Sequence, residues 1–546
     1  MGNMSAPDNA ATASSSPEHR TGATAPHASE KLSSTPEATG HPSSSPKTTN
    51  PPSTTSPAEA KEQTKAPEQT GYANVLSTLP PQLTGFQISG LVIGIIAFLI
   101  PFFVDVPNLA EPGERMLSIF LLAIVFWVTE AIPLTATAVL VILLEVLLIS
   151  QDALADPTHG DPELIEAALP AASYFAALAN PVIILFLGGF LIAHGAEKYG
   201  LDKNIAAVLL RPFTGSARIT VLGLMVITAL MSMFMSNTAT TATMFAVVIP
   251  IIGALPEGQA RTGVALSIPL AANVGGIGTP VGTPPNAIAV SALAERGIHV
   301  SFIHWMGMAV PFMLIVLVAS WLLLCSLFIP RDARIAISVD SAWDTSRPAI
   351  LFYIIAGTTI VLWMTEPIHQ ISSNTIGFFP VVALLCLRVM DGRDLGAINW
   401  AVLWLVSGGI ALGNGIGASG LDAWLVGSIN WENMSAMLVI ALLGFIGLGF
   451  ANVMSHSAAS NLLVPLAVSL ATALAGTSVV AVAATVAIAC SLGMSLPIST
   501  PPNAIAYSTG EISVKQMAIV GVIVGIAGTA LLVFVLPTVW SFLGLA

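Results

Sequence analysis

The sequence predicts an all-α, polytopic membrane protein with about eleven transmembrane helices, in which two halves repeat each other with inverted topology. Three observations lead to this fold class. Of the 546 residues, 54% are apolar and only 9% are charged, against roughly 25% charged in soluble domains. Many apolar runs approach the ~20 residues that a helix needs to cross a bilayer. Short motifs also occur twice in the same order, about 220 residues apart.

Composition and charge exclude several classes of protein. A soluble chain of this length could not cover its surface with so few charged residues, which excludes soluble enzymes and secreted disulfide scaffolds. The net charge of −12 gives no basic surface for nucleic acid. Cys325, Cys386 and Cys490 stand singly in apolar runs, which indicates packing rather than a disulfide or metal set.

Residues 1–80 differ from the rest of the chain. Ser, Thr and Pro recur there without apolar periodicity, which predicts a disordered tail. The tail has no continuous apolar segment, so it is not a cleavable signal peptide. It is either passive or a phosphorylated or partner-binding segment.

Apolar segments that we expect to span the membrane begin at residue 88. They lie near 88–104, 117–131, 134–150, 180–195, 219–253, 305–329, 349–364, 375–389, 401–417, 436–475 and 516–543. Two further apolar stretches, 262–296 and 478–510, are interrupted by Gly and Pro, and their halves are too short to span. We expect them to form re-entrant hairpins, whose backbone must be shielded by protein or face a water-filled cavity.

Five landmarks define the internal repeat. They are Gly188-Gly189 with Gly408-Gly409, Gly200-Leu201-Asp202 with Gly420-Leu421-Asp422, Ser236-Asn237-Thr238 with Ser455-His456-Ser457, the Thr-Pro-Pro-Asn motifs beginning at Thr283 and Thr500, and Trp127-x-Thr129-Glu130 with Trp363-x-Thr365-Glu366. The predicted organisation is a first half at 88–300, a connecting helix and cytoplasmic linker at 301–344, a second half at 345–510 and a last helix at 511–546.

The orientation of the halves follows from positive charge. Lys198, Lys203, Arg211 and Arg218 follow the first Gly-Gly span, whereas the equivalent stretch at 418–436 has no Lys or Arg. Positive residues mark the cytoplasmic side, so the two equivalent stretches lie on opposite sides. Inverted repeats are typical of secondary transporters, whose substrate site lies at broken helices near the midplane.

Polar residues interrupt an apolar span in each half. Ser, Asn and Thr cluster between 232 and 243, and the cluster recurs at 455–461. A single cluster would be ordinary hydrogen bonding within or between helices. Its recurrence at equivalent positions favours an ion or substrate site.

The two Thr-Pro-Pro-Asn motifs form the second polar element of each half. Paired prolines end a helix and remove N–H donors, so the carbonyls of Gly282, Thr283, Ser499 and Thr500 lose helical partners. Carbonyl, Asn and Ser oxygens suit a hard cation such as Na⁺. A structural turn without a ligand is the alternative.

Fixed positive charge is missing near both breaks. We expect Arg115 to lie in a loop, and Arg261 and Arg296 flank the first hairpin. An anion would therefore depend on helix N-termini, bound cations or a protonated His456. Such an anion would bind mainly together with its cations, which is symport. A neutral substrate also fits this inventory.

The residues quoted above resemble the divalent anion/sodium symporter family, the sodium-coupled dicarboxylate and citrate carriers. The resemblance covers residues 88–543 and rests on Ser236-Asn237-Thr238, on the run from Gly275 to Asn286, and on the motif at Thr500. It implies a homodimer of inverted-repeat protomers with a scaffold and a mobile transport domain, moving by an elevator mechanism. It implies a C4-dicarboxylate (succinate, malate or fumarate) or citrate as substrate, coupled to Na⁺. The location would be the inner or plasma membrane, with a cytoplasmic N-terminal tail.

Site roles are implied by the same resemblance. Substrate contacts are implied for Ser236, Asn237, Thr238, Thr283, Ser455, His456, Ser457, Thr500 and Pro501. Ligation of one or two Na⁺ is implied for Ser232, Ser236, Asn237, Gly282, Asn286, Ala451, Ser499 and Asn503.

The second half departs from the family pattern. His456 stands where Asn is expected, and Ala451-Asn452 stands where the family often has Thr-Glu. His456 could replace Asn as a neutral donor, take over part of the cation role by carrying H⁺, or simply pack as a neutral side chain.

Other functions remain as alternatives. A carrier of the same fold could move sulfate or another anion, or exchange anions without strict sodium coupling. An intramembrane hydrolase using His456 or His194 is remote, because adjacent Ser455 and His456 diverge on a helix, and we predict no enzyme. Glu145 lies in the middle of a span without a repeat partner, and its role is open between a structural group and a proton relay.

Overall fold

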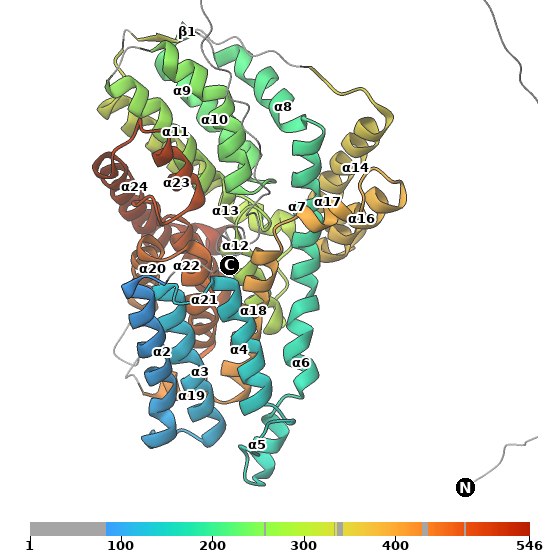
Figure 1. The fold of residues 1–546 in the computed structure, drawn as a ribbon, viewed down its shortest axis with the longest axis vertical. Coiled ribbons are helices and arrows are strands. Elements are labelled where there is room, and N and C mark those ends of the chain that lie inside the picture. The colour runs from blue at the N-terminus through green and yellow to red at the C-terminus, as the bar shows by residue number, and fades with distance from the viewer. Residues whose placement is uncertain are drawn as a thin grey trace, which may run out of the picture. The chain divides into compact units, whose positions relative to one another are not determined.

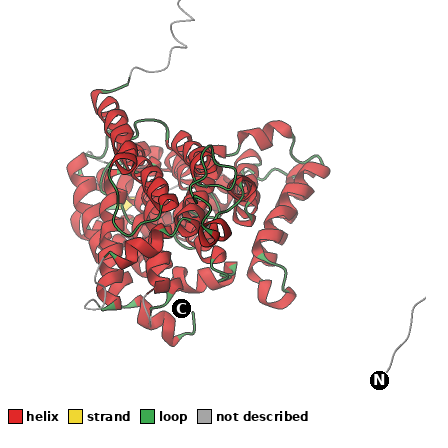
Figure 2. Ribbon diagram, turned by 90° about the horizontal axis from the view of Figure 1, so that it is seen from below, coloured by secondary structure: helices red, strands yellow, loops and turns green. Residues whose placement is uncertain are grey.

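The computed structural model describes residues 83–213, 215–255, 258–331, 333–335, 342–428, 435–473 and 477–545. The tail predicted at 1–80 and part of the predicted linker, at 336–341, lie outside the described residues. The described chain is helical apart from one pair of two-residue strands, as Figure 2 shows. The all-α prediction is confirmed.

The elements of the first half and the connecting helix are labelled in Figure 1. They are α2 (Gly85–Phe103), α3 (Glu111–Thr129), α4 (Leu134–Leu148), α5 (Pro162–Ala167), α6 (Ala171–Ala176), η1 (Ala177–Ala179), α7 (Pro181–Lys198), α8 (Leu201–Leu210), η2 (Arg211–Phe213), β1 (Gly215–Ser216), α9 (Ala217–Ser232), α10 (Asn237–Ala254), α11 (Gln259–Gly276), α12 (Pro284–Glu295), α13 (Phe302–Leu327) and β2 (Arg334–Ile335).

The elements of the second half and the C-terminal region follow in the same order. They are α14 (Arg347–Met364), α15 (Glu366–His369), α16 (Ser373–Cys386), α17 (Gly392–Ala397), α18 (Trp400–Ala418), α19 (Leu421–Gly427), α20 (Ala436–Val453), α21 (His456–Ala473), α22 (Val479–Ser491), α23 (Pro501–Ser508), α24 (Val514–Phe534) and α25 (Leu536–Phe542).

The helices carry the lengths and surfaces of a membrane protein. Within the described residues, eight helices are long and apolar enough to cross a bilayer, and five shorter apolar helices accompany them. Large apolar side chains such as Phe103, Ile354 and Val361 are exposed, as lipid requires and water does not tolerate in quantity. The polytopic membrane prediction is confirmed.

Helices of the two halves pack on each other crosswise. In each half the helix before the break packs on the first helix of the hairpin, α9 on α11 and α20 on α22. The second hairpin helix instead contacts the broken helix of the other half: α12 packs on α21, and α23 on α10. In Figure 1, α12 lies beside α21 and α22 near the centre of the view. This exchange brings breaks and hairpin turns from both halves together.

The Gly-Gly landmarks let two further pairs of helices approach closely. A Cβ added at Gly188 in α7 would lie 1.9 Å from the carbonyl oxygen of Gly377 in α16. A Cβ at Gly408 in α18 would lie 2.4 Å from the Cβ of Ala138 in α4. Both contacts join one half to the other, and only a residue without a side chain permits them.

Candidate functional site

Serine residues begin the helix that follows each break. Ser236 is the N-cap of α10, and its Oγ accepts a hydrogen bond of 3.1 Å from the Ala239 N–H. At the start of α21 the Oγ of Ser455 accepts one of 3.2 Å from the Ala458 N–H. Serine is a preferred N-cap because its oxygen satisfies an N–H that the first turn leaves unpaired. The repeated motifs are thus two equivalent helix starts.

Asparagine side chains hold the two hairpin turns. The Nδ2 of Asn286 donates to the carbonyls of Gly276, Ile277 and Thr279, at 3.0, 3.1 and 2.7 Å. These bonds use the amide nitrogen for the turn, and the Oδ1 of Asn286 has no hydrogen-bond partner among the described residues.

The second turn is held in the same way. The Nδ2 of Asn503 donates to Met494 and Leu496, at 2.8 and 3.0 Å. Both asparagines therefore act first as braces of the turns, beside the ion-binding role that the resemblance implies for them.

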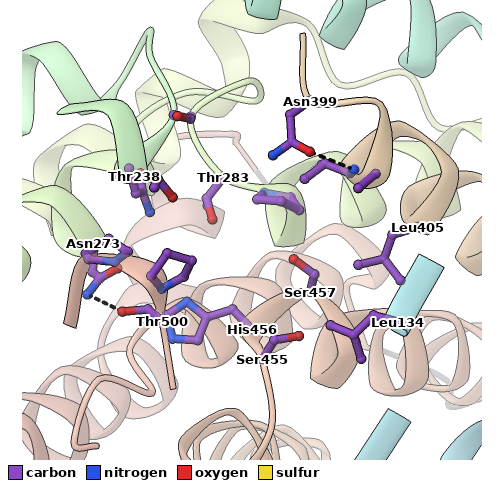
Figure 3. A pocket seen from close by; sticks show the side chains of 18 of the residues that line it. Leu134, Thr238, Asn273, Thr283, Asn399, Leu405, Ser455, His456, Ser457 and Thr500 are labelled. Atoms are coloured by element: carbon purple, nitrogen blue, oxygen red, sulfur yellow. Dashed lines mark hydrogen bonds between the residues drawn. The ribbon is translucent and has the colours of Figure 1, made fainter. Parts of the chain in front are cut away.

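Residues from both helix breaks and both hairpin turns line one cavity of about 290 Å³, which Figure 3 shows. Of the predicted site residues, those that line it are Ser236, Asn237, Thr238, Gly282, Thr283, Ser455, His456, Ser457, Ser499, Thr500 and Pro501. Four others, Ser232, Asn286, Ala451 and Asn503, are buried and do not line it. Segments more than 200 residues apart in sequence thus share one space.

Three polar residues of the cavity were not predicted from the sequence. They are Thr135, Asn273 and Asn399. Asn273 in α11 donates from Nδ2 to Thr500 Oγ1 at 3.3 Å, the dashed line in Figure 3, and to Asn503 Oδ1 at 3.2 Å. Its own Oδ1 has no partner among the described residues. The sequence signal for Asn273 is a single amide in an apolar run. The repeat does not reinforce this signal, because Cys490 stands at the equivalent position.

Positive potential in the cavity comes from helix ends. The lining residues include no Lys, Arg, Asp or Glu. The first residues of α10, α12, α21 and α23 all line the wall, so four helix N-termini meet there. The helix dipole makes all four N-termini favourable for anions. Unpaired N–H groups add to this effect at α10 and α21, whereas α12 and α23 begin with paired prolines that lack N–H donors. The cavity is built to hold negative charge without a fixed cation.

Beside the cavity, the first half holds a cluster of three oxygens. The Oγ of Ser232 lies 2.6 Å from Asn237 Oδ1 and 2.8 Å from the Ala272 carbonyl oxygen. One hydroxyl proton serves these two contacts between oxygens, so the cluster has more acceptors than donors. Hydroxyl, amide and carbonyl oxygens are the ligands of hard cations. These residues fit Na⁺.

Comparison with known proteins identifies the family. Residues 86–546 match the family described as the sodium:sulfate symporter transmembrane region. The chain belongs to this family. It is a multi-pass membrane transporter and not an enzyme, and the family resemblance drawn from its motifs is confirmed.

Relatives with names are found among bacterial transporters. The "Sodium-dependent dicarboxylate transporter SdcS" of Staphylococcus aureus (strain USA300) is 29% identical over 488 residues, which are 82% of this chain and 90% of that protein. The protein of the same name from Staphylococcus saprophyticus is 28% identical over 491 residues, 82% and 90% of the two chains. The solved structure of the Alcanivorax borkumensis YdaH transporter aligns at 16% identity with a TM-score of 0.47, over 68% of this chain and 87% of that chain.

In the second half of this transporter, His456 contacts the hairpin. The ring Nε2 lies 2.7 Å from the Gly493 carbonyl oxygen. A carbonyl only accepts, so Nε2 carries a proton and donates. The ring also lines the cavity. His456 is thus a donor to the hairpin at the cavity wall, an arrangement that fits all three predicted roles.

Two other titratable groups singled out in the sequence lie away from the cavity. Glu145 in α4 is fully buried, and neither carboxyl oxygen has a hydrogen-bond partner among the described residues. His194 Nε2 lies 3.3 Å from Asp394 Oδ1, and Lys198 Nζ lies 2.7 Å from Asp394 Oδ2. This ion-paired cluster joins α7 to α17 and contains no serine that a hydrolase would need.

Proposed function

We propose that this transporter is a symporter that moves a dicarboxylate across the membrane together with Na⁺. The observation that carries the proposal is the cavity: four helix N-termini and polar side chains from both halves surround a space without Lys or Arg. An anion held there lacks a fixed counter-charge, so mobile cations must compensate it. The named relatives, sodium-dependent dicarboxylate transporters, support this reading.

The duplicated donor sets favour a substrate with two separated anionic groups. Ser236, Asn237 and Thr238 supply donors from the first half, and Ser455 and Ser457 supply hydroxyl donors from the second. The His456 ring lines the same wall, with its Nε2 donating to the Gly493 carbonyl. A C4-dicarboxylate such as succinate, malate or fumarate places one carboxylate at each set. Thr283, Thr500 and Pro501 line the wall near the hairpin turns and would limit the length of the substrate. Citrate would add a third carboxylate for the same donors.

The coupled Na⁺ ion would bind next to the substrate cavity rather than inside it. Ser232 and Asn237 supply its side-chain oxygens, with Ser236, Gly282 and Asn286 close to the same helix break and turn. Asn237 belongs to both the oxygen cluster and the cavity wall, so ion and substrate share one side chain. Binding of either one then orders the side chain that the other needs.

The movement proposed for this symporter is elevator-type alternating access in a homodimer, within the inner or plasma membrane and with a cytoplasmic N-terminal tail. The crosswise contacts of hairpins and broken helices support it, since they join the substrate-binding parts of both halves into one group. Rigid movement of that group would carry the whole cavity.

Uptake by the purified chain in liposomes tests the function. Radiolabelled succinate, citrate and sulfate are offered with an inward Na⁺ gradient, with an inward K⁺ gradient, and with unlabelled succinate inside. We expect succinate uptake that needs Na⁺ and is inhibited by malate and fumarate. Preferred uptake of sulfate would identify the sulfate carrier instead. Uptake that needs internal succinate but no Na⁺ would identify an exchanger.

A further inference from the structure

The two halves differ at the position of the cation cluster. The repeat pairs Ser232 with Ala451 and Asn237 with His456. In the first half these two side chains supply two of the three clustered oxygens. In the second half, alanine has no hydroxyl and imidazole has no oxygen. Both side-chain ligands are therefore missing on one side only.

At the second turn, an imidazole N–H donates to the carbonyl oxygen of Gly493. Gly493 is the repeat equivalent of Gly276. The carbonyl of Gly276 accepts from Asn286, but the equivalent Asn503 donates to Met494 and Leu496. The carbonyl of Gly493 would be free, and it accepts from His456 Nε2 at 2.7 Å. A donor stands where a cation would otherwise satisfy this oxygen.

Other oxygens around the second turn already have protein donors. Asn503 Oδ1 accepts from Asn273, and Asn452 Oδ1 accepts from the Ser495 N–H at 2.9 Å. Ser499 Oγ accepts from the Leu496 N–H at 3.2 Å and donates to the Asn452 carbonyl at 3.1 Å. Ser495 Oγ has no partner among the described residues, but a lone hydroxyl does not make a cation site. The side-chain oxygens of Asn452, Ser499 and Asn503 are therefore satisfied without an ion.

We infer that each protomer has a single sodium site, beside Ser232 and Asn237, and that His456 replaces a second sodium ion with an N–H donor. This inference rests on the proposed sodium-coupled function and specifies its ion count. Ala451, Ser499 and Asn503, which the resemblance implied as Na⁺ ligands, then support the turn instead. The expected number of sodium ions is the same whether or not Nδ1 of His456 also carries a proton, because the ring has no oxygen ligand in either state.

Equilibrium binding of ²²Na⁺ to the purified full chain in detergent, with saturating succinate, tests the count directly. We expect one ion per chain for the natural sequence. The double variant Ala451→Ser/His456→Asn copies the first half and should bind two. The Na⁺ dependence of succinate uptake should change with it, from a Hill coefficient near one to a value clearly above one.

A second pair of variants keeps the test decisive if the double variant fails to fold. Ser232→Ala should weaken ²²Na⁺ binding at least tenfold, because one of the three clustered oxygens is lost. Ser118→Ala is the matched control, since Ser118 is also a buried serine, and it donates only to the Glu114 carbonyl in its own helix. This control should still bind one ion.

Two outcomes overturn the inference alone: two ions bound to the natural chain, or Na⁺ binding to Ser232→Ala with unchanged affinity. Absence of any ²²Na⁺ binding and of any sodium-dependent uptake would refute the proposed function as well, so the two failures are distinguishable.

Discussion

Sodium and dicarboxylate should bind this symporter cooperatively, and the size of the effect follows from the site. Asn237 contributes its Oδ1 to the oxygen cluster, and its side chain lines the substrate cavity. The ion and the nearer carboxylate are therefore separated by about one amide group, roughly 6 Å. At an effective dielectric near 20, that separation gives an attraction of about 3 kcal/mol. The site is buried, so salt screens this attraction weakly.

An attraction of that size corresponds to about 100-fold in affinity. Replacing Na⁺ by choline at constant ionic strength should weaken succinate binding by about this factor. By reciprocity, removing succinate should weaken Na⁺ binding by the same factor. Ser232→Ala should weaken Na⁺ binding at least tenfold, because one of three clustered oxygens is lost.

Isothermal titration calorimetry on the purified protein measures both affinities. Succinate is titrated in Na⁺ and in choline, and Na⁺ is titrated with and without succinate. Ser118→Ala serves again as the control with an unchanged profile. Equal succinate affinity in Na⁺ and choline would show that the cavity holds its anion without a cation, and the electrostatic reasoning would be wrong.

Three further variants test individual contacts. Thr238→Val removes a cavity hydroxyl whose hydrogen bond contributes about 1 kcal/mol. The KM for succinate should therefore rise about fivefold, and the Na⁺ dependence of uptake should stay unchanged. A loss of Na⁺ dependence would contradict the assignment of Thr238 to substrate rather than ion binding. Gly276→Ala places a Cβ 2.5 Å from Asn237 Oδ1. Such overpacking costs roughly 1–3 kcal/mol of stability, so the melting temperature and the Na⁺-dependent uptake should both fall. Gly357→Ala, where no atom lies within 4 Å, is its control and should lower neither. Asn286→Leu leaves three carbonyls of the first turn without their side-chain donor, at a cost of roughly 1–3 kcal/mol for a buried group. The midpoint of thermal unfolding should therefore drop. An unchanged midpoint would show that the turn does not need the hydrogen bonds from Asn286.

Much of the fold could be predicted because its signals are local. Apolar runs of spanning length, the serine N-caps at Ser236 and Ser455, and the paired prolines after Thr283 and Thr500 each act on the backbone within one helical turn. The structure shows helix starts at these positions. The single spans expected at 219–253 and 436–475 are each two helices, α9 with α10 and α20 with α21, because the chain leaves the helix between Ser232 and Asn237 and between Val453 and His456. Arg115, expected in a loop, lies in α3.

Side-chain partners in the site were harder to predict. Asn273 donates to Asn503, a residue 230 positions away, and the sequence contains no repeat signal for this pair. The role of Asn286 and Asn503 as ion ligands stays a prediction, and the sequence did not indicate that their amide nitrogens hold the turns. Such assignments depend on distances between helices that no local pattern specifies.

The sequence by itself determined the membrane setting, the duplication and the places where helices break, because composition, motif spacing and proline act without reference to tertiary contacts. Tertiary structure alone decided that both breaks and both turns meet at one cavity, and that the His456 ring bonds to the Gly493 carbonyl. Packing between distant segments sets which donor reaches which oxygen, and no local sequence pattern specifies those distances.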